Sequence, residues 1–396
     1  MDTPLLRTDV QEFINASMQG NFTKIALMKN PFPEVKWNDI LNQIASKAKA
    51  KDKLPSWYAH KCIIYPSKVS IEQTSSEIAA KYKASLISGV TLIDLTGGFG
   101  IDDYFFAQHF NKVAHCEINE ELSAIVDHNY HILNQRNIEC YQGDSLEILK
   151  KLNQKWSWIY IDPSRRSDVK GKVFMLKDCL PNVPNLLDTY FEYSDNILIK
   201  TAPILDITSG LSELSFVKNI HIIAVDNEVK ELLWEIEKGF SGETTLNAVS
   251  ISKNETSIFS VPLSDVHSDQ KSEYSLPLKF LYEPNAAMMK TGAFEKIGIH
   301  YNISKLHQHS HLYTANNDID FPGRKFAVKD LFHFDKTAMK KNLEGKKCNI
   351  TARNFPVTVE DLRKKWKLKD GGDLYCFFTT NLNNEKIVLL CEKLSP

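Results

Sequence analysis

The pattern of apolar positions changes near residue 89. Before it, apolar residues recur at helical spacing, as in segments 10–18 and 40–44, and prolines divide the region into short pieces. After it, apolar segments of strand length alternate with segments of helical length. This alternation predicts a parallel, doubly wound α/β sheet that follows a helical N-terminal region. The predicted strands are 90–95, 112–118, 138–144, 156–162 and 196–201.

Another group of strands follows this alternation. Segment 221–227 has a strand pattern, and segments 246–253 and 255–262 predict an antiparallel hairpin that turns at Asn254. The polar stretch 264–275 is typical of a linker, and residues from 277 to 320 form a small unit of weak pattern.

Residues 321–396 predict a small α+β domain. Segment 347–353 has a strand pattern, and Thr358 with Asp361 is typical of the capping box that begins a helix. The apolar spacing of that helix predicts that Trp366 packs inward and leaves a solvated basic face. The strands of a closing hairpin are predicted at 373–380 and 386–393.

The composition is that of a globular protein, with 396 residues of which 43% are hydrophobic and 24% charged. The formal net charge of −1 argues against a chain that is coated in positive charge. The distribution is uneven, however, because residues 321–396 hold 16 Lys and Arg against 9 Asp and Glu, a net charge of +7. A basic end on an acidic body suggests a module that binds a partner.

The seven cysteines are scattered and form no CxxC pair, so neither a disulfide framework nor a zinc ribbon is indicated. The first residues lack the features of a signal peptide, and no apolar run has the length of a membrane span. We therefore expect a cytoplasmic protein that does not bind a membrane.

A glycine-rich turn directly follows the first predicted strand. Gly97, Gly98 and Gly100 stand between the strand and a helix, where glycines allow a ligand to approach the backbone closely. The dinucleotide fingerprint GxGxxG fails because Asp103 stands at its third glycine. Asp94 at the strand end is unsuited to a pyrophosphate and favours a ligand with an amino group.

Three successive predicted strands end in acidic residues. Asp94 is followed by Glu117, which is placed to accept the hydroxyl groups of a ribose, and by Asp144, which is placed to accept an adenine amino group. The carboxyl ends of neighbouring parallel strands are where open α/β sheets bind ligands. One such acid is ordinary turn or cap chemistry, but the three together with the glycine turn predict a site for S-adenosylmethionine (SAM).

Four segments resemble the motifs of class I SAM-dependent methyltransferases. They are DLTGGFGID at 94–102, HCEIN at 115–119, GDSLEIL at 143–149 and WIYIDPSRR at 158–166. The resemblance covers roughly residues 89–265 and implies a Rossmann-like, seven-stranded sheet whose last strands form an antiparallel hairpin, matched here to the pair around Asn254. The cofactor-binding residues that it implies are Asp94, Thr96, Gly97, Gly98, Gly100, Glu117, Ile118, Asp144 and Ser145.

The wider chain resembles a bacterial group of these enzymes with a C-terminal THUMP-like domain. The matching segments are 72–77, 227–231, 283–287 and 353–357. True THUMP domains bind structured RNA, and the label transfers that property only by analogy of fold. The implied domains are a helical region at 1–88, a methyltransferase domain at 89–265, a ferredoxin-like domain at 272–320 and a basic THUMP-like α+β domain at 321–396.

The fourth motif holds the expected catalytic residues Asp162, Pro163, Ser164 and Arg165. In amino-group methyltransferases with an Asp/Asn-Pro-Pro-aromatic motif, the acid or amide holds the target amino group and the ring stacks on the base. Ser164 and Arg165 replace the last two positions, which puts an adenine N6 target in doubt. A structural turn with surface arginines is the alternative interpretation. The expected substrate-binding residues are Arg166, Lys200, Arg363 and Lys364.

Other chemistry fits the sequence less well. Cys179 is the only cysteine shortly after the fourth motif, and it lies in no recognisable catalytic setting. His307, His309 and His311 alternate as on one strand face, but no Cys or acid at ligand spacing accompanies them, so no metal is expected. Gln73 and Glu77 are placed over the cofactor by the resemblance alone.

The sequence therefore predicts a SAM-dependent methyltransferase that acts on a base in tRNA or rRNA. Two alternatives stay open at this point. One is a methyltransferase that acts on a small molecule or a protein, and the other is a SAM-binding or RNA-binding protein without catalysis.

Overall fold

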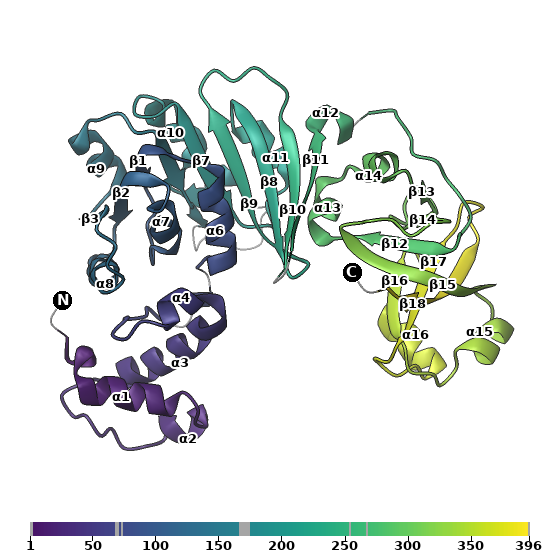
Figure 1. Ribbon diagram of the computed structural model, residues 1–396, viewed down its shortest axis with the longest axis horizontal. Coiled ribbons are helices and arrows are strands. Elements are labelled where there is room, and N and C mark those ends of the chain that lie inside the picture. The colour runs from purple at the N-terminus through teal and green to yellow at the C-terminus, as the bar shows by residue number, and fades with distance from the viewer. Residues whose placement is uncertain are drawn as a thin grey trace. The chain divides into compact units, whose positions relative to one another are not determined.

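The structure is a computed structural model that describes residues 3–67, 71–72, 74–165, 175–252, 255–266 and 268–394. Gln73, Arg166 and the predicted turn at Asn254 lie outside the described residues. The chain divides into two compact units. The N-terminal unit comprises Met1–Lys218 and Leu232–Ser241, and the C-terminal unit comprises Asn219–Glu231 and Gly242–Pro396. Figure 1 labels their elements.

The N-terminal unit begins with helices, as the apolar spacing predicted. Residues between 5 and 44 enclose a core of their own that includes Val10, Ile14, Ile40 and Ile44, the positions that recur at helical spacing. In Figure 1 these helices are purple and dark blue. They are the short 3-10 helix Pro4–Leu6, α1 (Thr8–Ser17), α2 (Phe22–Ala26), α3 (Trp37–Lys53), α4 (Pro55–Tyr58) and α6 (Glu77–Leu86).

The five strands predicted from the alternating pattern are all present and mutually parallel, in the order β7-β4-β1-β2-β3. The apolar runs of the four inner strands are buried, as in parallel sheets generally, whereas the edge strand is largely exposed. The strands are β1 (Gly89–Asp94), β2 (Phe110–Glu117), β3 (Ile138–Gln142), β4 (Trp158–Ile161) and β7 (Asn196–Thr201). The helices that connect and follow them are α7 (Ile101–Phe106), α8 (Glu120–Ile132), α9 (Ser145–Leu152), α10 (Val183–Tyr190) and α11 (Ile207–Glu213).

The hairpin expected at the end of the methyltransferase sheet lies elsewhere in the sequence. The strand antiparallel to β7 is β9 (Glu228–Glu237), which the sequence did not predict because four Glu and one Lys among its ten residues hide the strand pattern. It follows β8 (Val217–Val225) through Asp226 and Asn227, whose φ values of 49° and 63° are typical of a two-residue hairpin turn.

The pair around Asn254 is an antiparallel hairpin, as predicted, but it adds strands beyond the expected set. β10 (Thr245–Ile251) lies parallel to β8 from Asn219 to Val225, and β11 (Thr256–Pro262) pairs with β10. The sheet therefore counts nine strands instead of the seven that the resemblance implied.

A second, seven-stranded sheet fills the rest of the C-terminal unit, in the order β13-β14-β12-β15-β18-β17-β16. Because β12 pairs with β15, the segments expected as ferredoxin-like and THUMP-like domains share one sheet. Its strands are β12 (Phe280–Pro284), β13 (Ser304–Lys305), β14 (Tyr313–Ala315), β15 (Gly323–His333), β16 (Asn349–Arg353), β17 (Leu374–Thr380) and β18 (Lys386–Lys393). Its helices are α12 (Leu263–Val266), α13 (Ala286–Thr291), α14 (Phe294–Tyr301), α15 (Lys336–Asn342) and α16 (Val359–Trp366).

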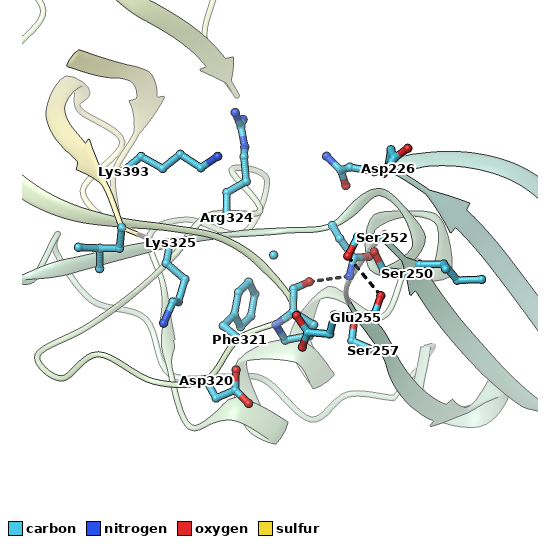
Figure 2. Close-up of a pocket in the computed structure, with 16 residues that line it drawn as sticks. Asp226, Ser250, Ser252, Glu255, Ser257, Asp320, Phe321, Arg324, Lys325 and Lys393 are labelled. Atoms are coloured by element: carbon cyan, nitrogen blue, oxygen red, sulfur yellow. Dashed lines mark hydrogen bonds between the residues drawn. The ribbon is translucent and has the colours of Figure 1, made fainter. Parts of the chain in front are cut away.

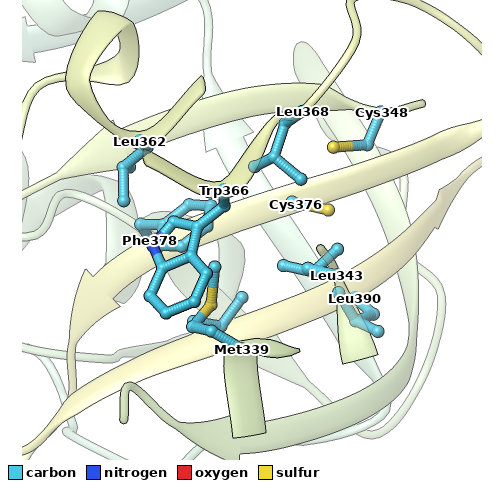
Figure 3. Close-up of a cluster of buried hydrophobic side chains, with 10 residues drawn as sticks. Met339, Leu343, Cys348, Leu362, Trp366, Leu368, Cys376, Phe378 and Leu390 are labelled. Carbon is cyan, nitrogen blue, oxygen red and sulfur yellow. The ribbon is translucent and has the colours of Figure 1, made fainter. Parts of the chain in front are cut away.

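Helix α16 confirms the capping box and the inward Trp. The hydroxyl of Thr358 accepts a hydrogen bond from the backbone N–H of Asp361 at 3.2 Å. Trp366 is 4% exposed and packs with Leu362 and Met339 in a core that Figure 3 shows against the strands. The basic residues of the helix are left on its other face.

Within the described part of the chain, no helix is both long enough and apolar enough to cross a membrane.

Replacing Trp366 with Ala removes a buried ring and should lower the free energy of unfolding of this domain by about 3–5 kcal/mol. The measurement is the denaturant midpoint followed by circular dichroism. Lys364→Ala, at an exposed position of the same helix, is the control and should change stability by less than about 0.5 kcal/mol. Equal midpoints for the two variants would contradict the packing.

Candidate active site

The turn between β1 and α7 requires glycine at two positions for steric reasons. A Cβ on Gly97 would lie 2.2 Å from the His115 ring, and one on Gly100 would lie 2.1 Å from the Tyr130 hydroxyl oxygen. Gly100 also has a φ of 75° and precedes helix α7. Gly98 has a φ of 57°, but there is room for a side chain at this position. A Cβ added to it would lie 3.6 Å from its nearest neighbour, the carbonyl oxygen of Thr96. The open side of the turn is therefore at Gly98.

Thr96 joins this turn to the fourth motif. Its backbone N–H and its hydroxyl donate to Asp94 Oδ1 at 2.7 and 3.0 Å. The same hydroxyl oxygen accepts the backbone N–H of Asp162 at 2.6 Å. One side chain thus fixes the glycine turn relative to the predicted acceptor motif, which lies 66 residues further along the chain.

Asp94 holds the turn from inside the protein. It is 2% exposed, and burial together with the neighbouring Asp103 raises its pKa well above the ordinary value. Asp103 is itself buried and lies 2.7 Å from His115 Nδ1, where burial lowers the pKa of the imidazole. The expected contact of Asp94 with the methionine part of SAM stays a prediction; what Asp94 does here is accept the hydrogen bonds of Thr96.

Glu117 lies at the carboxyl end of β2, and both oxygens of its carboxylate accept hydrogen bonds from the backbone. Oε2 accepts the backbone N–H of Gly98 at 2.9 Å, and Oε1 accepts that of Asn119 at 2.7 Å. Next to it, Ile118 is 70% exposed, which is unusual for so large an apolar side chain. An oriented carboxylate beside an exposed aliphatic surface fits a ribose and the base attached to it.

Asp144 and Ser145 lie where β3 leads into α9. Asp144 is the N-cap of that helix, because its Oδ1 accepts the backbone N–H of Glu147 at 3.0 Å. This is the capping role that any single strand-end acid was expected to have. Its side chain is nevertheless exposed, so an adenine amino group has access to it.

The carboxylate of Asp162 forms an ion pair with the ammonium group of Lys200, which projects from the neighbouring strand β7. The sequence placed both residues at strand ends, and the structure brings them together. The Lys200 side chain is 12% exposed and that of Asp162 is 37% exposed, so the lysine is largely buried and the carboxylate is accessible from solvent.

A buried polar network behind Lys200 was missed by the sequence interpretation. Lys200 Nζ donates to Ser75 Oγ at 3.2 Å, and Ser75 Oγ donates to Asp102 Oδ2 at 3.0 Å. Lys83, which is fully buried, lies 3.0 Å from Asp102 Oδ1, and the Tyr160 hydroxyl donates to Asp102 Oδ2 at 2.8 Å. Only the position of Asp102 directly after the glycine turn could have drawn attention to it.

Asp102 stays charged inside this network. Burial alone would raise the pKa of its carboxyl group, but the ammonium groups of Lys83 and Lys200 and the bond from Tyr160 outweigh it and lower the pKa. The network therefore gives Lys200 a fixed charged neighbour on its buried side.

Ser164 and Arg165 of the fourth motif form a short strand. β5 (Ser164–Arg165) pairs antiparallel with β6 (Cys179–Leu180), which follows the 3-10 helix Leu176–Asp178. The Arg165 side chain lies outside the described residues, as does Arg166. Cys179 is fully buried, which agrees with a structural cysteine.

The other predicted residues take no part in these contacts. Arg363 and Lys364 are on α16 in the C-terminal unit, where Arg363 pairs with Asp370. Glu77 is buried and accepts the backbone N–H of Ser56 at 2.8 Å.

The histidines do not share a strand face. His307 lies in a loop and bonds to Asn384 and Asn354 at 3.0 Å each, whereas His311 stacks on Phe294. Among the described residues, no group of three or more His, Cys, Asp or Glu side chains could hold a metal ion.

Family models match the C-terminal part of the chain. Residues 280–322 match a ferredoxin-like domain, and residues 323–393 match a THUMP domain-like family. A comparison with curated protein sequences found no match.

Among solved structures, the chain is similar to a candidate methyltransferase from Porphyromonas gingivalis W83, with a TM-score of 0.87 and 27% sequence identity over 98% of both chains. The match to TrmK of M. capricolum, solved with S-adenosyl-homocysteine, covers 41% of this chain and 68% of TrmK, with a TM-score of 0.33 and 16% sequence identity. The match to an rRNA methylase from Streptococcus thermophilus covers 41% of this chain and 94% of the methylase, with a TM-score of 0.30 and 14% sequence identity. Partial matches at these TM-scores add nothing further about this chain.

The chain therefore has a methyltransferase fold that is followed by a ferredoxin-like and a THUMP-like domain. This confirms the resemblance that the four motifs and the C-terminal segments carried.

The two glycines of the turn should respond differently to substitution by Ala. Gly97→Ala overlaps the His115 ring and should destabilise the protein by about 1–3 kcal/mol or more. Gly98→Ala meets only the cost of its positive φ, about 1–2 kcal/mol. Urea unfolding of both variants measures the difference, and a larger loss for Gly98→Ala would contradict the geometry of the turn.

Proposed function

We propose that the chain is a SAM-dependent methyltransferase that methylates a base in tRNA or rRNA. The observation that carries the proposal is the Thr96 hydroxyl, which bonds to Asp94 at the glycine turn and to Asp162 at the acceptor motif. It places the loop proposed for the cofactor directly beside the loop proposed for the acceptor. The similarity over 98% of the chain to a candidate methyltransferase supports the same activity.

The residues around the turn fit SAM. Glu117 would accept the ribose hydroxyl groups, Ile118 would pack on the adenine, and Asp144 would accept the adenine amino group. The open space at Gly98 admits a ligand against the backbone. Thr96, Gly97, Gly100 and Ser145 would shape the site around these contacts. When bound, SAM supplies a methyl group on a sulfonium that is already a strong electrophile.

The chain's task is then to position the nucleophile. Asp162 would accept a hydrogen bond from an N–H of the acceptor and hold its nitrogen lone pair in line with the methyl group. Lys200 would fix the orientation of that carboxylate, because it is itself fixed by Ser75 and Asp102. Pro163 and Ser164 would support this position through the backbone, and the proton of the acceptor would leave to solvent after transfer.

The proposed RNA partner rests on the C-terminal domain. It carries the THUMP domain-like match and the net charge of +7. Arg363 and Lys364 would contact phosphate groups there, and Arg165 and Arg166 would contact the substrate beside Asp162.

Asp162→Ala tests the proposal directly. It should lower the rate of methyl transfer to total RNA by about 100-fold or more, because the acceptor loses its positioning contact. SAM affinity, measured by calorimetry, should stay within about twofold. Asp188→Ala, an exposed aspartate on α10, is the matched control and should leave both quantities unchanged. Unchanged transfer by Asp162→Ala would exclude the proposed role, and SAM binding without transfer to any RNA would favour a small-molecule or protein substrate.

A further inference from the structure

The C-terminal unit contains a pocket of about 430 Å³, none of whose lining residues belongs to the proposed active site (Figure 2). Its walls come from the Asp226-Asn227 turn, from the facing ends of β10 and β11, and from residues 320–325 with Lys393. The volume lies in the range of small-ligand pockets, roughly 300–1,000 Å³.

Specific side-chain bonds hold these walls together. Asn227 Oδ1 accepts the backbone N–H of Ala286 at 2.8 Å, and Asn285 Nδ2 donates to the Pro322 carbonyl at 2.5 Å. Asp226 and Asn227 both have positive φ, a conformation that non-glycine residues adopt at a cost. The pocket is therefore preformed by contacts between segments that are distant in sequence.

Arg324 at the pocket wall is anchored by a buried carboxylate. Glu283 is 3% exposed, and its Oε2 accepts from Arg324 Nε at 2.6 Å while its Oε1 accepts from Arg353 Nη2 at 3.0 Å. One carboxylate thus neutralises only one of two guanidinium groups. The Arg324 side chain keeps 38% of its surface exposed, so its orientation is fixed while part of its positive charge remains available.

Lys393 is the second cation of this wall. It lies opposite Phe326 in the β15–β18 pairing, and Arg324 precedes Phe326 by two residues. Side chains at such diagonal positions emerge on the same face of a sheet, about 7–8 Å apart. Figure 2 shows the side chains of both residues among those that line the pocket.

Lys325, the third cation of the lining, forms an ion pair with Asp318, and the other polar side chains of the lining are acidic or carry hydroxyl or amide groups. Asp226, Glu255 and Asp320 supply exposed carboxylates, and Ser250 and Ser257 supply hydroxyl groups. A ligand that suits the whole pocket therefore combines an anionic group with several hydroxyl or amino donors. The guanidinium fork matches the oxygens of a phosphate group.

We infer that this pocket binds one nucleotide, with its phosphate on Arg324 and Lys393 and its ribose and base donors on the carboxylates and hydroxyls. The nucleotide is either free or part of an RNA strand. The inference deepens the proposed function, because in an RNA strand this nucleotide would be a contact of the substrate away from the methylated base. It assigns a role to segments 227–231 and 283–287, which the proposed active site does not use.

Calorimetric titration of the full chain tests the pocket. The probes are uridine and cytidine 5′-monophosphate, the corresponding nucleosides, inorganic phosphate and a single-stranded RNA pentanucleotide. S-adenosylhomocysteine is present throughout to occupy the proposed cofactor site. We expect a mononucleotide or the pentanucleotide to bind at least about tenfold more tightly than the nucleosides and than inorganic phosphate.

Lys393→Ala should weaken this binding about tenfold, because it removes a charged partner of the phosphate. The matched control is Lys329→Ala, which removes an exposed lysine that pairs with Glu392 on the same sheet and does not line the pocket, and should change Kd by less than twofold. Arg324→Lys keeps the charge but loses the fork, and should also weaken binding. Binding of the pentanucleotide alone would identify an RNA strand as the source, and binding of the mononucleotide alone would identify a free nucleotide.

Three results would overturn the inference: no binding of any nucleotide probe, equal Kd values for Lys393→Ala and the unmodified chain, or inorganic phosphate as tight as the nucleotide. The assay involves no methyl transfer, so its outcome is separate from that of the proposed function. Asp162→Ala should bind the probes as the unmodified chain does, even if it is inactive.

Discussion

The hydroxyl of Thr96 connects the two loops on which the proposed chemistry depends. It can do so because β1 and β4 are adjacent parallel strands, so their carboxyl ends emerge side by side. Asp94 supports this arrangement from the interior of the protein, because its Oδ1 accepts the hydrogen bonds of Thr96. Burial raises the pKa of its carboxyl group. An acid that the sequence suggests as a ligand contact thus stabilises the shape of the turn that the ligand would meet.

Buried charged residues behind the acceptor motif hold the carboxylate of Asp162 in place. Asp102 balances Lys83 and Lys200 inside the protein, and Lys200 reaches from there to the partly exposed Asp162. Burying one carboxylate with two ammonium groups leaves a positive charge that the Asp162 carboxylate satisfies at the surface. We interpret the network as a means of fixing Asp162 through residues that do not meet the substrate.

Local patterns in the sequence predicted the strands β1 to β4, strand β7, the glycine turn, the capping box at Thr358 and the inward Trp366. Each depends on residues that are near one another in the chain. The patterns did not predict β9, whose charges hide its alternation, or the nine-stranded extent of the sheet. They also missed the Lys83–Asp102 and Glu283–Arg324 pairs, because ion pairs between distant segments leave no periodic signal. The site was therefore predicted as a set of strand ends, without the contacts that orient it.

RNA methylation by this chain is tested most directly by comparing methylated nucleosides, by mass spectrometry, in total RNA from cells with and without the protein. We expect that one methylated nucleoside of tRNA or rRNA disappears when the protein is absent. This nucleoside should return with the unmodified chain and should not return with Asp162→Ala. An unchanged set of methylated nucleosides would contradict the proposed RNA methylation.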